Sequence, residues 1–417
     1  MTVDRARAER LDAADPLAAF RDQVVIADPD LLYLDGNSLG RLPVGTAERL
    51  ARAAREEWGR GLVRSWSDWV DLPRRVGDLL GTRLLQARPG EVVIADSTSI
   101  NLYKLAAAAV DARPDRRVIV TDDDNFPTDR YVLAGLAHER GLDLRPVHTD
   151  ADDGVDLPAL TRALDDDVAL LSLSHVSYRS GAVADLAAVT RLAHRAGALT
   201  LWDLSHSAGS VPVSLTDAEV DLAVGCTYKY LCAGPGAPAY LYVRRELQEQ
   251  LRQPIWGWFG QRDQFAMGPE YDPAPGIDRF CVGTPSVLAI YAVEEGVRLV
   301  ADAGVDALYR KGQALTGFLV ELAEAWLAPL GFRVASPRDD ARRGAHLTLH
   351  HPAAWQICQA AADRGVIADY RTPDRLRLGP APLYTRFVDG YDALDRLREL
   401  VAAGAHEGYP AEPARVT

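Results

Sequence analysis

Lysine is nearly absent from this chain of 417 residues. Among 46 lysines and arginines, only Lys104, Lys229 and Lys311 are lysines. An arginine guanidinium does not form Schiff bases, whereas a lysine amine of lowered pKa does. The lysine kept between Tyr228 and Tyr230 therefore predicts a need for an amine at position 229. We interpret Lys104 and Lys311 as surface lysines, because both lie in helix-like stretches from which a long side chain can reach water.

The chain also lacks dense cysteine, long apolar runs and an excess of positive charge. Its four cysteines have neither metal-binding nor disulfide-scaffold spacing, so we expect reduced thiols in a cytoplasmic protein. No apolar run approaches the roughly 20 residues of a membrane span. Met1–Pro16 is charged and lacks an apolar core, so we expect no secretory signal. A net charge of −13 argues against nucleic-acid and anionic membrane partners.

Short β-rich runs alternate with helix-like segments between Val92 and Val243. Such alternation predicts an α/β domain with a mostly parallel sheet, with functional residues beyond the carboxyl ends of its strands. The clearest helix is Asp185–Ala196, which has a capping Asp at its start and Gly197 after its end. The predicted strands are Val92–Ala95, Val118–Thr121, Val168–Leu173, Ala198–Trp202, Leu222–Val224 and Ala239–Val243.

The sequence pattern changes near Val287, where two long helical stretches precede short strands and further helices. We interpret this part as a smaller α+β domain. At the other end, Thr46–Trp58 predicts one amphipathic helix. The expected divisions are an N-terminal helical segment packing with the small domain (1–60), a large α/β domain (61–288) and the small domain (289–417).

Three segments carry candidate chemistry besides Lys229. Thr98 and Ser99 open a helix after a strand, which suits an anion, although a plain helix cap is the commoner use of such residues. No Walker lysine and no Gly-x-Gly-x-x-Gly accompanies them, so a nucleotide is not favoured. Phe126 could stack on a flat ring or pack as a staple at a helix start, with Asp129 in the first turn.

Asp203 ends an apolar strand, with His206 three residues later. A buried carboxylate needs a cationic or hydrogen-bonded partner, and a protonated pyridine nitrogen is one such partner. A structural Asp–His pair or part of a catalytic triad is the alternative, but the chain has no Gly-x-Ser-x-Gly elbow for a triad. Together with Lys229, the three segments form the set of groups expected in a pyridoxal phosphate enzyme.

At this point the sequence resembles the kynureninase family, within the class V aminotransferase-like group of fold-type-I pyridoxal phosphate enzymes. The resemblance covers nearly the whole chain. The matching segments are Leu34–Gly40, Asp96–Leu102, Asn125–Asp129, Trp202–Ser207, Cys226–Leu231, Gly257–Gly260, Arg279–Thr284, and Leu376–Leu378 with Ala381–Tyr384.

The resemblance implies roles for particular residues. Lys229 would form the Schiff base with pyridoxal 5'-phosphate, Asp203 would hold the ring nitrogen proton, and Tyr228 is the candidate proton donor. Arg377 would clamp the substrate α-carboxylate with its planar fork. The other implied cofactor contacts are Thr98, Ser99, Phe126, Pro127, Thr128, Asp129, Ser174, His206, Trp258 and Thr284. The other implied substrate contacts are Asn37, Ser38, Trp66 and Gln261.

The implied reaction is hydrolysis of the Cβ–Cγ bond of L-kynurenine, 3-hydroxykynurenine or a ring-substituted kynurenine, in tryptophan degradation or in NAD-related or secondary metabolism. Trp258 and Thr284 would come from the neighbouring subunit of a homodimer. Gln261 stands where the family usually has His, and Cys232 where it usually has Asn, which leaves the aryl preference open. The alternatives are another class V lyase or aminotransferase, and a non-catalytic relative.

Overall fold

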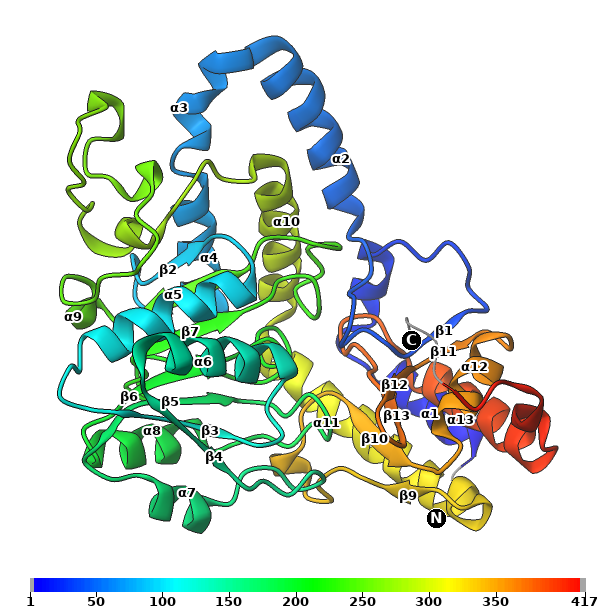
Figure 1. Cartoon of the computed structure of the whole chain (residues 1–417). Coiled ribbons are helices and arrows are strands. Elements are labelled where there is room, and N and C mark those ends of the chain that lie inside the picture. Colours follow the sequence, from blue (N-terminus) through cyan, green and yellow to red (C-terminus); the bar gives the residue numbers. More distant parts are fainter. Residues whose placement is uncertain (1–3, 413–417) are drawn as a thin grey trace.

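A seven-stranded sheet forms the centre of the larger part of the molecule (Figure 1). The computed structural model describes residues 4–412. Only β8 runs antiparallel to its neighbours, and the predicted mostly parallel sheet is confirmed. In spatial order the strands are β2 (Val92–Ile94), β8 (Tyr240–Val243), β7 (Leu222–Gly225), β6 (Leu199–Asp203), β5 (Val168–Ser174), β3 (Val118–Asp122) and β4 (Asp143–Val147).

Helices cover both faces of this sheet, which explains the continuously apolar strands. Successive residues of one strand enter different cores: Val92 packs with residues of α4, whereas Val93 packs with residues of α5. The predicted capped helix is confirmed, since Asp185 accepts a hydrogen bond from the Ala188 N–H at 2.8 Å. The helices are α4 (Leu72–Leu84), α5 (Thr98–Asp111), α6 (Pro127–Arg140), α7 (Leu157–Ala163), α8 (Leu186–Arg195) and α9 (Arg245–Gln248).

The C-terminal part contains long helices and short strands, as predicted, and the strands form a four-stranded antiparallel sheet. β1 (Leu32–Tyr33) pairs with β11 (Val366–Ile367), and α1 (Arg5–Ala13) packs on α13, so the N-terminal segment lies against this part. The three expected divisions stay a prediction, and their ends at 1–3 and 413–417 lie outside the described residues. The sheet is β12 (Asp369–Arg371), β13 (Arg375–Leu378), β10 (Leu347–His350) and β9 (Arg333–Val334). The helices are α10 (Val287–Ala303), α11 (Val305–Leu322), α12 (Ala354–Ala362) and α13 (Phe387–Ala402).

Residue alternation gives the small sheet one apolar and one polar face. In β13, Leu376 and Leu378 join the core between the sheet and its helices. Arg377 lies on the other face and donates from Nη1 to the Tyr178 carbonyl of the large part at 2.6 Å. Because side chains of a strand alternate between faces, the polar face meets the carboxyl ends of the large sheet.

A helical arm extends from the top of the molecule in Figure 1. It begins as α2 (Val44–Arg52), continues as a wider helix over Ala53–Gly61, and turns back through α3 (Trp66–Trp69). The expected helix Thr46–Trp58 lies within this arm. Between residues 4 and 412 no helix combines the length and the apolar character required to cross a membrane.

The interpretation of Lys104 and Lys311 as surface lysines is wrong. Lys104 is fully buried, and its Nζ lies 2.5 Å from Asp96 and 2.8 Å from the Phe280 carbonyl. Lys311 is also buried, at 2.7 Å from Asp15. Both charges are tolerated inside because each has an acidic partner. The pair of Lys311 with Asp15 is not visible in the sequence, because the two residues come from distant segments.

Candidate active site

A cavity of about 420 Å³ lies at the carboxyl ends of the central strands. Ser174 is the last residue of β5 and Asp203 the last residue of β6, and Lys229 follows β7 in the next loop. This is the place where parallel sheets bind ligands. The predicted site residues that line the cavity are Thr98, Ser99, Phe126, Thr128, Asp129, Ser174, Asp203, His206, Tyr228, Lys229 and Thr284.

The loop that carries Lys229 is fixed by the N-terminal turn. The Gly40 N–H donates to the Tyr228 carbonyl at 2.8 Å. A Cβ at Gly40 would lie 2.3 Å from the Lys229 carbonyl oxygen, so only glycine allows this approach. The turn formers after Leu34 therefore hold the lysine loop in place.

His206 is the hydrogen-bond partner of the Lys229 amine. Lys229 Nζ lies 3.0 Å from His206 Nε2. Burial, with the nearby Lys229 charge adding to it, lowers the pKa of His206 well below its usual value. The imidazole is therefore neutral, so its Nε2 can accept a hydrogen bond from the amine while Nδ1 carries the ring hydrogen.

Two buried carboxyl groups, Asp129 and Asp203, lie at the inner end of the cavity. The Ser205 N–H donates to Asp203 at 2.6 Å, whereas Asp129 Oδ2 has no hydrogen-bond partner among residues 4–412. Burial raises the pKa of both groups, and the charge of Asp203 further raises the pKa of Asp129. Burial therefore disfavours two negative charges on the pair, and a cationic ring nitrogen would stabilise a charge there.

The opposite end of the cavity is suited to an anion. Helix α5 starts there, and Ser97 caps it by accepting from the Ile100 N–H at 3.4 Å. The first-turn N–H groups of Thr98 and Ser99 have no acceptor within the helix, and the helix dipole favours negative charge. Phe126 lines the cavity with 39% of its surface exposed, which leaves area for a flat ligand ring.

Arg377 lies in a separate polar cluster beside the cavity, together with Asn37 and Ser38. Arg377 Nη2 donates to Ser38 Oγ at 2.9 Å and also to Asp369. The Asn37 amide fits its neighbours when its oxygen faces Arg377, at 2.8 Å from Nε and 3.2 Å from Nη2. Gly379 permits this approach, since a Cβ there would meet Asn37 Oδ1 at 1.6 Å.

Four other predicted site residues do not line the cavity. Pro127 is the first residue of α6. Trp66 packs near Phe259, with ring centroids 6.3 Å apart, and Trp258 is 40% exposed. Gln261 bonds within its own hairpin, accepting from the Asp272 N–H at 2.7 Å.

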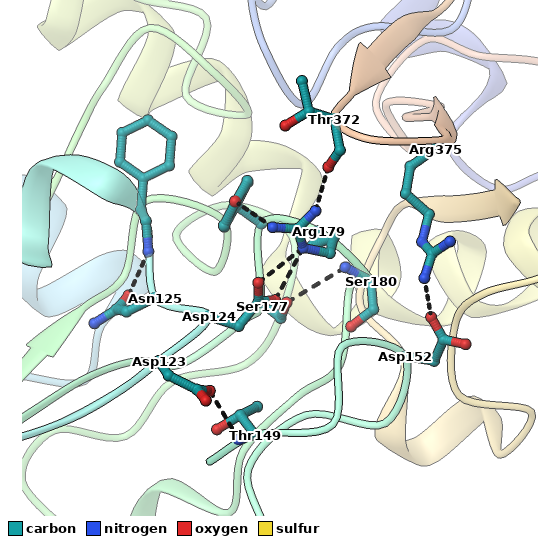
Figure 2. A network of polar contacts seen from close by, with 12 residues as sticks. Asp123, Asp124, Asn125, Thr149, Asp152, Ser177, Arg179, Ser180, Thr372 and Arg375 are labelled. Atoms are coloured by element: carbon teal, nitrogen blue, oxygen red, sulfur yellow. Dashed lines mark hydrogen bonds and ion pairs between the residues drawn. The ribbon is translucent and has the colours of Figure 1, made fainter. Parts of the chain in front are cut away.

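The seam between the two parts is polar (Figure 2). Arg179 donates through Nε to Asp124 at 2.8 and 3.1 Å, and through Nη1 to the Thr372 carbonyl at 2.5 Å. Arg375 pairs with Asp152 at 3.0 Å. The Arg179 contacts connect the turn between β12 and β13 with the loop that leads to Phe126, whereas the Arg375 pair connects β13 with the loop after β4.

Sequence reasoning missed several residues at this seam. Tyr178 meets Phe126 edge to face at 5.3 Å. His346 is fully buried, its ring lies 5.2 Å from that of His206, and neither nitrogen has a hydrogen-bond partner among residues 4–412. Asp369 and Arg371 belong to the Arg377 cluster. The alternation of charged and apolar residues in Arg375–Leu378 could have indicated this polar face.

Comparison with known proteins first defines the class. The family model Aminotransferase class-V matches residues 82–351. The cysteine desulfurase of Thermococcus onnurineus NA1 has a TM-score of 0.81 at 19% identity, covering 92% of this chain and 98% of that chain. The cystine C–S lyase C-DES has a TM-score of 0.79 at 18% identity, covering 89% and 98%. The fold is that of the class V aminotransferases, of fold type I, and the predicted fold class is confirmed.

Closer relatives narrow the class to one family. The model Kynureninase C-terminal domain matches residues 308–397. Kynureninase from Pseudomonas fluorescens is 45% identical over 94% of each chain. Kynureninase from Burkholderia pseudomallei (strain K96243) is 46% identical over 95% of each chain. The chain belongs to the kynureninase family.

Proposed function

We propose that this protein cleaves the Cβ–Cγ bond of L-kynurenine, or of a ring-hydroxylated or ring-substituted kynurenine, by hydrolysis. The products are anthranilate, or its substituted form, and L-alanine, and the cofactor is pyridoxal 5'-phosphate. The observation that carries the proposal is the amine of Lys229, held 3.0 Å from a neutral His206 in the cavity that ends at Asp203. Identity of 45% with a kynureninase over nearly the full length supports it.

The cavity offers residues suited to the ring nitrogen, the ring face and the phosphate of the cofactor. Bound pyridoxal phosphate supplies an aldehyde that condenses with amines and a protonated ring that accepts electrons from breaking bonds. Asp203 and Asp129 would hold the ring nitrogen proton. Phe126 would cover one face of the ring. The remaining proposed cofactor contacts are Thr98, Ser99, Pro127, Thr128, Ser174, His206, Tyr228, Trp258 and Thr284.

Lys229 and Tyr228 would move the protons. The Lys229 amine, once free, removes the substrate α-proton, and His206 keeps the amine oriented through its Nε2. Burial raises the pKa of Tyr228 far above neutrality. The phenol therefore keeps its proton and can donate a hydrogen bond or a proton in the later steps.

Substrate binding would use both parts of the molecule. Arg377 with Asn37 and Ser38 would bind the α-carboxylate, because a guanidinium matches a carboxylate through two parallel hydrogen bonds. Trp66 and Gln261 would lie near the aryl ring. The preference among kynurenines depends on this aryl side.

We also propose that the active unit is a homodimer that shares its active sites. The helical arm exposes four large apolar residues, Val44 at 43%, Trp58 at 60%, Leu62 at 58% and Val63 at 75%. Another segment exposes Trp256 and Phe265. Several large apolar side chains left exposed on one chain are typical of an interface. Trp258, in the same segment as Trp256, would then reach the cofactor of the partner subunit.

A cysteine-based reaction is the alternative on this fold, and the thiols do not favour it. Cys226, Cys232, Cys281 and Cys358 are all buried. Burial raises the pKa of Cys232, Cys281 and Cys358 to about 12. A desulfurase-type nucleophile needs a lowered pKa and access to the cofactor.

Two measurements test the proposal. Purified protein with pyridoxal phosphate should show a Schiff-base absorbance band that is absent from Lys229→Ala. Incubation of the wild-type protein with L-kynurenine should then release fluorescent anthranilate together with alanine in equal amounts. A Lys229-dependent band without product from kynurenine, 3-hydroxykynurenine or ring-substituted kynurenines would retain the cofactor but exclude the reaction. A missing band would exclude both.

A further inference from the structure

We propose that Asp369 is a built-in competitor for the substrate carboxylate. In the substrate-free protein it occupies the place on Arg377 that the α-carboxylate takes during binding. A ligand therefore reaches Arg377 only if it carries a negatively charged group that can replace Asp369. This inference rests on the proposed function, because it requires Arg377 to bind the substrate carboxylate.

The first observation is the burial of the pair. Arg377 is 1% exposed and Asp369 is 2% exposed. The two side chains are hydrogen-bonded through Arg377 Nη2 and Asp369 Oδ2. They lie on neighbouring strands, since Asp369 is directly opposite Arg377 in the β12–β13 ladder. An incoming carboxylate therefore meets a guanidinium that already has a counter-charge.

The second observation is which nitrogen Asp369 occupies. A carboxylate can bind a guanidinium with two parallel bonds either at Nη1 and Nη2 or at Nε and Nη2, so Nη2 belongs to both edges. Nη2 has two hydrogens and donates to Asp369 and to Ser38 Oγ, and the Asn37 oxygen lies 3.2 Å away. Nε faces the same Asn37 oxygen at 2.8 Å, and Nη1 donates to the Tyr178 carbonyl. Either bidentate arrangement therefore displaces a partner of Nη2, together with Asn37 at the Nε edge or the Tyr178 carbonyl at the Nη1 edge. Asn37 and Tyr178 contribute neutral oxygens. Among these partners, Asp369 is the one with the same negative charge as the substrate carboxylate.

The third observation is a second arginine that can hold the displaced carboxylate. Arg371 Nη2 already donates to Asp369 Oδ2 at 2.8 Å. Arg371 Nε and Asp369 Oδ1 are both buried, and neither has a hydrogen-bond partner among residues 4–412. A small shift of Asp369 toward Arg371 can pair these two atoms. The exchange then leaves no buried charge alone.

Electrostatics explains the resulting selectivity. When the substrate carboxylate replaces Asp369, the negative charge next to Arg377 is unchanged. A neutral group in that place would leave a buried guanidinium without a counter-charge, which is strongly unfavourable. Ligands without a carboxylate therefore leave Asp369 where it is and gain nothing from Arg377. Rejection of the wrong ligand is built into the free protein rather than into contacts with the correct one.

The main experiment compares wild-type protein with Asp369→Asn in the pyridoxal phosphate-loaded enzyme. The amide keeps the size of the side chain and removes the competing charge. We expect the KM for L-kynurenine to fall by about tenfold or more, since close charge pairs couple by at least that much, while kcat changes little. The inhibition constant of the decarboxylated amine of kynurenine should stay the same, because that ligand does not displace Asp369.

Asp369 could instead serve only to orient Arg377, and this alternative predicts the opposite sign. Loss of the carboxylate would then misplace the guanidinium and raise the KM. An increased or unchanged KM in Asp369→Asn therefore overturns the inference. Asp363→Asn is the matched control, because Asp363 lies in the same part of the molecule and its hydrogen bond from the Tyr409 hydroxyl at 2.6 Å is exposed, outside the Arg377 cluster. Its KM should equal that of the wild type.

Arg371→Gln keeps the test available if Asp369→Asn does not fold. Without Arg371 the displaced carboxylate has no partner, so the KM for kynurenine should rise severalfold with an unchanged cofactor spectrum. An unchanged KM in Arg371→Gln would contradict the exchange. The proposed function is tested separately by cleavage in the wild-type protein. If the wild type cleaves kynurenine and neither variant shifts its KM as expected, only the role of Asp369 fails.

Discussion

At the scale of single residues, burial determines which ionisable groups carry charge. Asp122 ends β3 and is 5% exposed, beside Asp123 and Asp124. Burial, reinforced by the charge of Asp124, raises the pKa of Asp122 from 3.8 to about 7. Its side chain accepts a hydrogen bond from the Asp124 N–H at 3.1 Å, but this bond does not offset the burial. Asp122 is therefore a group whose ionisation opposes folding.

This gives a prediction for the dependence of stability on pH. Between pH 4 and pH 7 the folded protein binds a proton at Asp122 that the unfolded chain has lost, so stability falls as the pH rises through this window. Asp122→Asn should remove this loss and be more stable than the wild type at pH 8 by about 1–3 kcal/mol, with little difference at pH 4. Thermal unfolding of both proteins from pH 4 to pH 8 measures the difference. Parallel curves would contradict the assignment, since other carboxyl groups affect both proteins equally.

Cavity residues could be predicted from the sequence where the chemistry requires one particular residue type. Lys229 stood out because the chain has few lysines, and Asp203 because it ends an apolar strand. Lys104 was misjudged, since its charge is hidden by Asp96 and by the Phe280 carbonyl, which lies 176 positions along the chain. Asp369 was also missed, because its partner Arg377 is brought to it by the fold. Its role depends on Arg377, which lies opposite it on the neighbouring strand, and the sequence alone does not give this register.

At the scale of elements, prediction succeeded where an element is buried on both faces. Strands β3, β5, β6 and β7 appear in the sequence as apolar runs because helices cover both sides of the sheet. The edge strand β4 (Asp143–Val147) was missed, since four of its five residues are at least partly exposed. Strand β12 was missed because it has only three residues, two of them charged. Short or exposed strands are defined by their partners in the sheet.

The loop segment around Arg179 supports a prediction about coupling between the two parts. Arg179 is bonded at once to Asp124, Tyr178 and the Thr372 carbonyl, and both charged side chains are 17% exposed (Figure 2). Arg179→Gln should lower the free energy of unfolding by about 1–3 kcal/mol, as expected for hydrogen bonds to charged groups. It should also raise the KM, because Thr372 lies in the turn that precedes Arg377.

Urea unfolding and steady-state kinetics measure both effects. Arg145→Gln is the control, because its pair with Asp165 at 2.8 Å is exposed. Exposed pairs contribute little, so this change should cost less than about 1 kcal/mol and leave the KM unaltered. Equal destabilisation by the two variants, or an unchanged KM in Arg179→Gln, would show that the seam does not position the substrate site.

At the scale of the whole molecule, the helical arm has more apolar surface than one chain can cover. One side of the arm is held against the rest of the chain, because Glu57 accepts from Tyr291 at 2.6 Å and from Trp69 at 3.1 Å. Its outer residues Trp58, Leu62 and Val63 remain exposed. A second copy of the chain is the partner that the proposed shared active sites require. The arm of one protomer would then lie next to the cavity of the other.

Trp58→Asp should therefore convert a dimer into monomers. A buried tryptophan often contributes more than about 2 kcal/mol to an interface, and a carboxylate in its place adds a desolvation cost. Sedimentation velocity of the wild type should give a dimer of the 45.4 kDa chain, and the variant should sediment as one chain. Cleavage of kynurenine should be lost along with the dimer, because the sites would no longer be complete. Leu157→Asp, on α7 at the bottom of Figure 1, is the control and should leave the dimer intact. A monomeric wild type, or a fully active monomeric variant, would exclude active sites shared between subunits.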